Sequence, residues 1–174
     1  RSLTLASAPQ TVPEESRPSG LIDLVAIRKP RSIQAESYRS IRTMLMVSSP
    51  QSKSKSLLFT SPLAGEGKSS TVANLGITLA SASLRVVIVD SDLRKPKQAS
   101  IFGQDGRLGL TRFLSAQSDL AGLAKPTQVP NLQLIPSGPL PGNPLELLSS
   151  KRMEQLVAHL RTLFDFILFD APPL

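Results

Sequence analysis

The sequence predicts one α/β domain in which a doubly wound, mostly parallel sheet is flanked by helices. Short apolar segments typical of strands alternate with longer segments that carry apolar residues at helical spacing. The run Val86–Val89 is β-branched throughout, which indicates a strand buried on both faces, as in a parallel sheet covered by helices. A chain of 174 residues, 40% of them hydrophobic, is large enough for one such domain.

Residues 1–31 are expected to form a linker ahead of the domain. They are rich in Pro and Ser and show no hydrophobic period. In residues 32–48 apolar side chains recur at three- and four-residue spacing, which predicts an amphipathic helix. Its apolar positions are Ala35, Tyr38, Ile41 and Leu45. The domain is therefore expected to span residues 32–174.

Four strands and two further helices are predicted in the rest of the chain. The strands are expected at residues 57–60, 86–90, 132–136 and 166–170. One helix is expected at residues 68–83. The other lies between the last two strands, where Asn143, Pro144 and Glu146 resemble a helix start and apolar residues recur from Met153 to Leu163. This order of elements predicts right-handed crossovers between parallel strands.

The composition excludes several kinds of site. The chain has no Cys, so disulfides and Cys-based metal or nucleophile sites are impossible. The net charge is +7, and residues 1–60 hold nine Lys or Arg against four acids. This basic excess suits an anionic lipid surface or an acidic partner, or is only a solvated face. Nucleic acid is disfavoured because no Trp and one Tyr offer little for base stacking.

A glycine-rich loop joins the first predicted strand to the next helix. Gly65 and Gly67 allow backbone N–H groups to turn toward phosphate oxygens, and the helix N-terminus adds its dipole. Lys68 is expected to reach the β- and γ-phosphates of ATP, and the Ser69 hydroxyl to bind Mg²⁺. Pro62 stands where the strict phosphate-loop pattern has its first Gly. The predicted nucleotide-binding residues are Gly65, Glu66, Gly67, Lys68, Ser69 and Ser70.

Carboxylates follow two of the predicted strands. Asp90 and Asp92 come after residues 86–89, and Asp170 ends the last strand. The carboxyl ends of parallel strands meet at the edge of the sheet where ligands bind. Asp170 is expected to bind Mg²⁺, directly or through water. Asp92 is expected to bind the same ion or to take part in catalysis with Lys68. Asp90 is the candidate base. Taken alone, each Asp equally suits a cap or a turn.

Four segments in this order resemble the bacterial tyrosine kinases of capsule and exopolysaccharide export, the BY-kinases. They are Leu63–Ser69 as a modified Walker A, Ile88–Pro96 as Walker A-prime, Asn143–Ser150, and Ile167–Pro173 as Walker B. The resemblance covers roughly residues 33–174. It implies a P-loop NTPase fold, ATP and Mg²⁺ as cofactors, and phosphorylation of tyrosines on a neighbouring subunit.

A fifth segment concerns assembly. Glu36, Arg39 and Arg42 are spaced by three on the first predicted helix and resemble the motif by which these kinases form rings, although a solvated helix face has the same pattern. The resemblance implies a homo-oligomeric ring, a membrane chain-length determinant domain or adaptor, and a cognate tyrosine phosphatase, without nucleic acid. It also implies the cytoplasmic face of the inner membrane, which the basic residues 1–31 suit.

The family continues past the Walker B strand with further strands and a tyrosine cluster, so we expect residues 32–174 to be a domain that stops after Walker B. Tyr38 is the only Tyr and falls on an apolar helix face, which favours packing over phosphorylation. Two alternatives remain: a ParA/MinD-like positioning ATPase, and an ATPase that controls assembly without phosphorylating. Leu63 and Leu93 stand where positioning ATPases usually have Lys and Pro, which favours the kinase.

Overall fold

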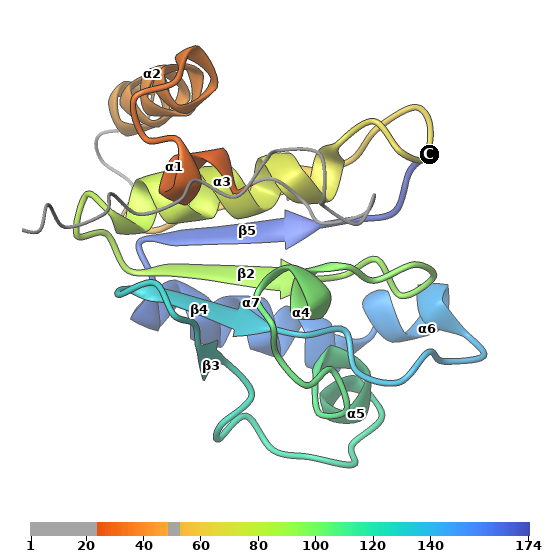
Figure 1. The fold of residues 1–174 in the computed structure, drawn as a ribbon. Helices are drawn as coiled ribbons and strands as arrows, with labels where there is room; N and C mark the ends of the chain where they lie inside the picture. Colours follow the sequence, from red (N-terminus) through yellow and green to blue (C-terminus); the bar gives the residue numbers. More distant parts are fainter. Residues whose placement is uncertain (1–23, 49–52) are drawn as a thin grey trace, which may run out of the picture.

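The computed structural model describes residues 24–48 and 53–174. Its strands form one sheet in the order β1-β5-β2-β4-β3, and all neighbours are parallel except β3 and β4. The strands are β1 (Lys55–Phe59), β2 (Val86–Asp90), β3 (Lys125–Pro126), β4 (Leu132–Ile135) and β5 (Phe166–Asp170) (Figure 1). The predicted mostly parallel sheet is therefore confirmed.

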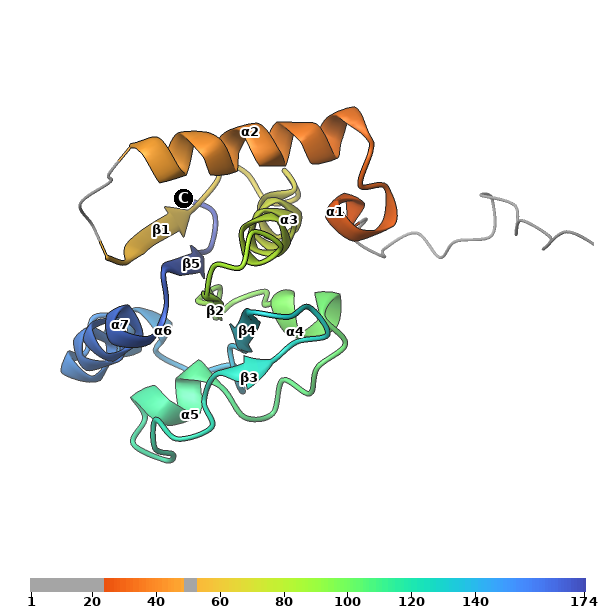
Figure 2. The same cartoon turned by 90° about the vertical axis from the view of Figure 1, so that its left-hand side faces the viewer.

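Helices cover both faces of the sheet (Figure 2). One face carries α1 (Val25–Arg28), α2 (Ile33–Val47), α3 (Lys68–Ala80) and α4 (Gln98–Ile101), and the other carries α5 (Leu110–Leu114), α6 (Pro144–Leu148) and α7 (Lys151–Leu163). Val86 and Ile88 of β2 enter the core under α3, whereas Val87 and Val89 enter the core under α7. This alternation buries β2 completely and makes the fold doubly wound. No helix in the described part of the chain is long and apolar enough to cross a bilayer.

The packed part of the chain begins earlier than the sequence suggests. Residues 24–28, which we assigned to the linker, include α1, and Leu24 and Ala26 pack against the core under α3. The Ala26 N–H donates to Oδ1 of Asn74, a buried residue of α3, at 3.0 Å. The side chain of Asn74 thus satisfies a backbone N–H in a segment whose composition alone does not predict a helix. Residues 1–23 of the predicted linker lie outside the described residues.

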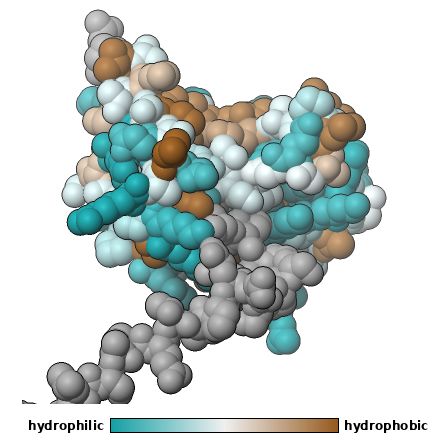
Figure 3. Space-filling model, turned by 45° about the horizontal axis from the view of Figure 1, so that its top comes forward, coloured by the Kyte–Doolittle hydropathy of each residue, from teal (hydrophilic) through white to brown (hydrophobic). Residues whose placement is uncertain are grey.

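Helix α2 is amphipathic as its spacing predicts, except that Ile41, one of the predicted apolar positions, is 38% exposed. Ser32 caps it by accepting the Ala35 N–H at 3.2 Å. Ala35 is buried, and Tyr38 is partly buried against the core, which confirms packing as the role of Tyr38. The other side of α2 exposes apolar residues: Met44 is 69% exposed and Val47 is 73% exposed. Figure 3 shows apolar and hydrophilic side chains interspersed over the side of the molecule that carries this helix.

The predicted helix start at Asn143 is only partly correct. Asn143 precedes α6, but its side chain caps no backbone N–H; instead its Nδ2 donates to Oε2 of Glu146 at 2.6 Å. The apolar residues further along belong to a separate helix, α7, which begins after Ser150 because the Ser150 hydroxyl accepts the Met153 N–H. A second cap therefore divides the segment into a short helix and a long one.

Gly109 is required where α5 meets the end of β4. A Cβ at this position would lie 2.1 Å from the Pro136 carbonyl oxygen and 2.6 Å from the Gly138 nitrogen. The next residue, Leu110, donates its N–H to that Pro136 oxygen at 2.7 Å. We expect Gly109→Ala to push α5 away and lower the free energy of unfolding by about 2 to 4 kcal/mol, because backbone atoms cannot yield as side chains do.

Urea unfolding followed by circular dichroism measures this effect. The control is Gly106→Ala in the same connection, where the added Cβ would make an ordinary contact, 3.5 Å from Cβ of Ala99. Equal destabilisation by both substitutions would contradict the steric explanation.

Candidate active site

The loop between β1 and α3 has the backbone that its glycines predict. Gly65 has φ 90° and Gly67 has φ 82°, values that side-chain-bearing residues resist. A Cβ added at either glycine would meet no atom within 4 Å, so the positive φ, and not a lack of space, calls for glycine here. Glu66 closes the turn by accepting the Leu63 N–H at 3.2 Å through Oε2. The loop and the start of α3 therefore form a cradle of the kind that holds phosphate.

A hollow of about 340 Å³ lies against this cradle. It is lined by Ser61, Ala64, Gly65, Gly67, Lys68, Ser69, Ser70, Asp92, Arg94, Lys95, Lys97 and Pro173. Four of these side chains are cationic and one is a carboxylate. Its volume is within the usual range for small-molecule sites, and its charge suits a polyphosphate. Arg94 and Lys95, which follow the A-prime carboxylates in sequence, are thereby placed beside the phosphate loop.

The parallel register brings the predicted carboxylates together. Asp90 on β2 lies directly beside Asp170 on β5, and both are fully buried. The ammonium group of Lys68 pairs with Oδ1 of Asp170 and lies 3.8 Å from Oδ2 of Asp92. Lys68 therefore contacts the carboxylates that follow two different strands, as expected if the phosphate loop and the strand ends share one crevice.

Asp90 and Asp170 are fully buried, and neither of them lines the hollow, whereas Asp92 does. Oδ2 of Asp90 accepts the N–H groups of Lys97 at 3.1 Å and Gln98 at 2.9 Å, while its Oδ1 has no hydrogen-bond partner within the described part of the chain. Burial raises the pKa of Asp90 to about 7, and the nearby charges of Asp170 and Asp92 act in the same direction. A carboxyl with a pKa near neutrality can exchange a proton at physiological pH.

The two carboxylate oxygens of Asp92 have different roles. Oδ1 accepts the N–H groups of Arg94 at 3.2 Å and Lys95 at 3.0 Å, which fixes the turn after β2. Oδ2 is the oxygen that faces Lys68. The turn-forming role and the role in the site are therefore both present in one side chain.

The donor atoms fit Mg²⁺. Ser69, Asp92 and Asp170 offer a hydroxyl and carboxylate oxygens, the ligands that Mg²⁺ prefers. Residues 24–48 and 53–174 contain no group of three or more His, Cys, Asp or Glu that could hold a metal by themselves. The ammonium of Lys68 beside the two carboxylates shows that this position accepts positive charge.

Sequence reasoning missed Gln98, the first residue of α4. It is fully buried and hydrogen-bonds to Ser69, Asp90 and Asp170. No periodic pattern or charge marks Gln98 in the sequence, since its partners come from three other segments of the chain.

The predicted assembly residues lie on α2 and do not line the hollow. Glu36 and Arg39 form an ion pair at 2.7 Å, and Arg39 also donates to the Pro30 carbonyl oxygen at 2.9 Å. Arg42 follows three residues later on the same helix. The structure thus holds Arg39 in a defined orientation on the surface.

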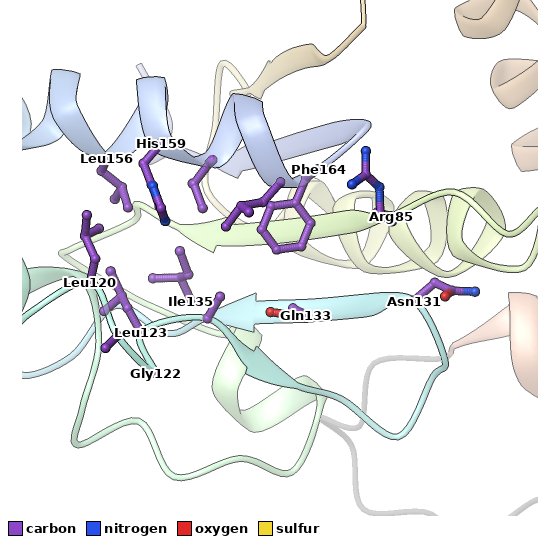
Figure 4. A pocket seen from close by; sticks show the side chains of 14 residues that line it. Arg85, Leu120, Gly122, Leu123, Asn131, Gln133, Ile135, Leu156, His159 and Phe164 are labelled. Atoms are coloured by element: carbon purple, nitrogen blue, oxygen red, sulfur yellow. The ribbon is translucent and has the colours of Figure 1, made fainter.

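A larger hollow, about 620 Å³, contains none of this chemistry. Figure 4 shows it between α7 and β4, with His159 and Phe164 above and Gln133 of β4 below. Its walls are mostly apolar, and no residue of the phosphate loop lines it. Volume alone would therefore select the wrong cavity as the active site.

This site is that of a P-loop NTPase. It combines a strand, a glycine-rich phosphate loop, the helix that follows the loop, and carboxylates at the strand ends. Residues 57–174 match the family model described as an AAA domain. Over 152 residues the chain is 38% identical to the tyrosine-protein kinase YwqD of Bacillus subtilis, a match that covers 87% of this chain and 64% of YwqD. The chain belongs to the bacterial tyrosine-protein kinases of the AAA domain family.

Solved structures of a kinase domain and of MinD share this fold. The VpsO kinase domain is 34% identical with a TM-score of 0.72, over 83% of this chain and 71% of that one. MinD of Pyrococcus horikoshii, solved with Mg-ADP, is 25% identical with a TM-score of 0.60, over 69% of this chain and 49% of that one. The chain spans less than two thirds of the length of YwqD.

Proposed function

We propose that this protein is an ATP-dependent tyrosine autokinase that regulates capsular or exopolysaccharide polymerisation and export. The observation that carries the proposal is the meeting of Lys68, Asp92 and Asp170 beside the phosphate loop, with Asp90 next to Asp170 on the neighbouring strand. Membership of the bacterial tyrosine kinases supplies the reaction class.

Each group of residues in this site has its own role in phosphoryl transfer. The loop N–H groups from Gly65 to Ser70 hold the phosphates, and Lys68 neutralises charge on the β- and γ-phosphates. Ser69, Asp92 and Asp170 would hold Mg²⁺, which would offset the charge that develops during transfer. Asp90 accepts the proton of the tyrosine hydroxyl, a role for which its raised pKa is suited.

Assembly would bring the acceptor tyrosine to this site. Glu36, Arg39 and Arg42 on α2 are the proposed ring contacts, and the exposed apolar residues Met44 and Val47 on the same helix favour burial against a neighbouring copy. The remaining proposed partners are a membrane chain-length determinant domain or adaptor and a tyrosine phosphatase, without nucleic acid. With these partners, the location that we propose is the cytoplasmic face of the inner membrane.

The decisive experiment separates kinase from ATPase. The protein is incubated with Mg-ATP and a synthetic Glu–Tyr copolymer, and phosphotyrosine and released phosphate are both measured. The variant Tyr38→Phe removes the only tyrosine of the chain, so all phosphotyrosine then belongs to the acceptor. We expect phosphotyrosine on the copolymer. Hydrolysis of ATP without phosphotyrosine would instead support a positioning or assembly ATPase, in keeping with the likeness to MinD.

A further inference from the structure

The side chain of Gln98 connects three parts of the nucleotide site. Its Nε2 donates to the carbonyl oxygen of Ser69 at 3.0 Å and to Oδ2 of Asp170 at 2.8 Å. Its backbone N–H donates to Oδ2 of Asp90 at 2.9 Å. Gln98 is fully buried, so these bonds are shielded from water and hold their partners firmly. One residue of α4 therefore fixes the phosphate-loop helix and both strand ends.

The bond to Asp170 determines how that carboxylate is turned. Oδ1 of Asp170 pairs with Lys68, and Oδ2 accepts from Gln98. A carboxylate held through one oxygen can rotate, whereas one held through both is fixed in plane and direction. Without Gln98, Oδ2 of Asp170 would lose this donor while remaining buried.

The orientation of the Gln98 amide shows which half of it the site uses. The NH₂ group donates twice, while Oε1 has no hydrogen-bond partner within the described residues. The reversed amide would set its oxygen against the Ser69 carbonyl and the Asp170 carboxylate, where each contact is repulsive. The site therefore uses an N–H donor at this position, although the amide oxygen of the same side chain stays buried and unpaired.

We propose that Gln98 is a positioning residue for Mg-nucleotide. It sets the Asp170 carboxylate and the backbone of Ser69 in the mutual orientation that a shared magnesium ion requires. The catalytic consequence rests on the proposed kinase function, but the effect on nucleotide binding does not. Partners that orient metal ligands commonly change metal affinity by about 10- to 100-fold when removed.

The test compares Gln98→Met with Gln104→Met. Both replace an amide by an apolar side chain of similar length, and both lie in the connection between β2 and β4. The side chain of Gln104 donates to the Pro126 carbonyl oxygen at 2.8 Å, and Gln104 does not line the hollow beside the phosphate loop. The affinity for a fluorescent ADP analogue is measured in EDTA and in Mg²⁺, together with the thermal unfolding temperature.

For Gln98→Met we expect an affinity in EDTA within about twofold of wild type, and a gain from Mg²⁺ that is reduced by about tenfold. Gln104→Met should keep the full gain. A wild type without any gain from Mg²⁺, or a Gln98→Met protein with the full gain, would overturn the proposal and leave Gln98 a structural residue only. If the Met variant does not fold, Gln98→Asn is measured instead. It keeps the amide but shortens its reach, and we expect the same reduced gain in affinity from Mg²⁺.

Failure of the kinase proposal is recognised separately. If the wild type transfers no phosphate to tyrosine but loses its Mg²⁺ gain on Gln98→Met, the positioning role stands and the kinase proposal fails.

Discussion

Lys68→Met is expected to abolish tyrosine phosphorylation and also to destabilise the protein. The ammonium of Lys68 is the cation beside two buried carboxylates, Asp170 and Asp92. Its loss removes the positive charge that stabilises the transferring phosphate, which we expect to lower kcat by at least about 100-fold. It also leaves Asp170 without the ammonium that pairs with Oδ1, at a cost of about 3 kcal/mol in the free energy of unfolding.

Phosphotyrosine on the copolymer and urea unfolding test the two effects in parallel. Lys53→Met is the matched control, because it removes an exposed cation just before β1. A Lys68→Met protein with wild-type stability would show that the pairing with Asp170 contributes little in solution. Retained phosphorylation would remove Lys68 from the mechanism.

Asp90→Asn is expected to lose activity and gain stability. Asn cannot accept the tyrosine proton, so kcat should fall by about 100- to 10,000-fold if Asp90 is the base. The amide oxygen of an Asn side chain can still accept the Lys97 and Gln98 N–H groups that Asp90 binds. The substitution therefore removes a buried titratable group while the local backbone keeps its hydrogen bonds.

The gain in stability should depend on pH. The pKa of Asp90 is about 7 in the folded protein and about 3.8 when exposed. At pH values between about 4 and 7, Asp90 is protonated in the folded protein but ionised in the unfolded chain. The contribution of Asp90 to the free energy of unfolding therefore falls as the pH rises through this range. The neighbouring charged groups Asp170, Asp92 and Lys68 are retained in Asp90→Asn. The stability advantage of Asn over Asp should therefore be larger at pH 8 than at pH 5, by about 2 kcal/mol.

Urea unfolding in EDTA at pH 5 and pH 8 measures this difference directly. The control is Asp105→Asn, which removes an exposed carboxylate that does not line the hollow. A stability advantage of the Asp90→Asn variant that is the same at both pH values would mean that Asp90 stays ionised in the folded protein. Activity retained in Asp90→Asn but lost in Asp92→Asn would transfer the role of base to Asp92, which lines the hollow.

The sequence by itself determined the parts of the site that depend on neighbouring residues. Gly65 and Gly67 are needed because the loop enters the left-handed region there, and Lys68 and Ser69 follow because the helix begins at that point. The strand of residues 86–90 could be predicted because burial on both faces selects an unbroken apolar run. The convergence of Asp90 and Asp170 followed from the rule that parallel strands end at one edge.

Only the tertiary structure decided the features that join distant segments. Gln98 acquires its role from Ser69 and Asp170, which lie 29 and 72 residues away in sequence. Likewise, α1 is ordered by Asn74 on another helix, and the fixed pairing of Lys68 with Asp170 spans 102 residues. Local spacing encodes elements and backbone turns, but a buried hydrogen bond depends on which side chains the packed core places opposite each other.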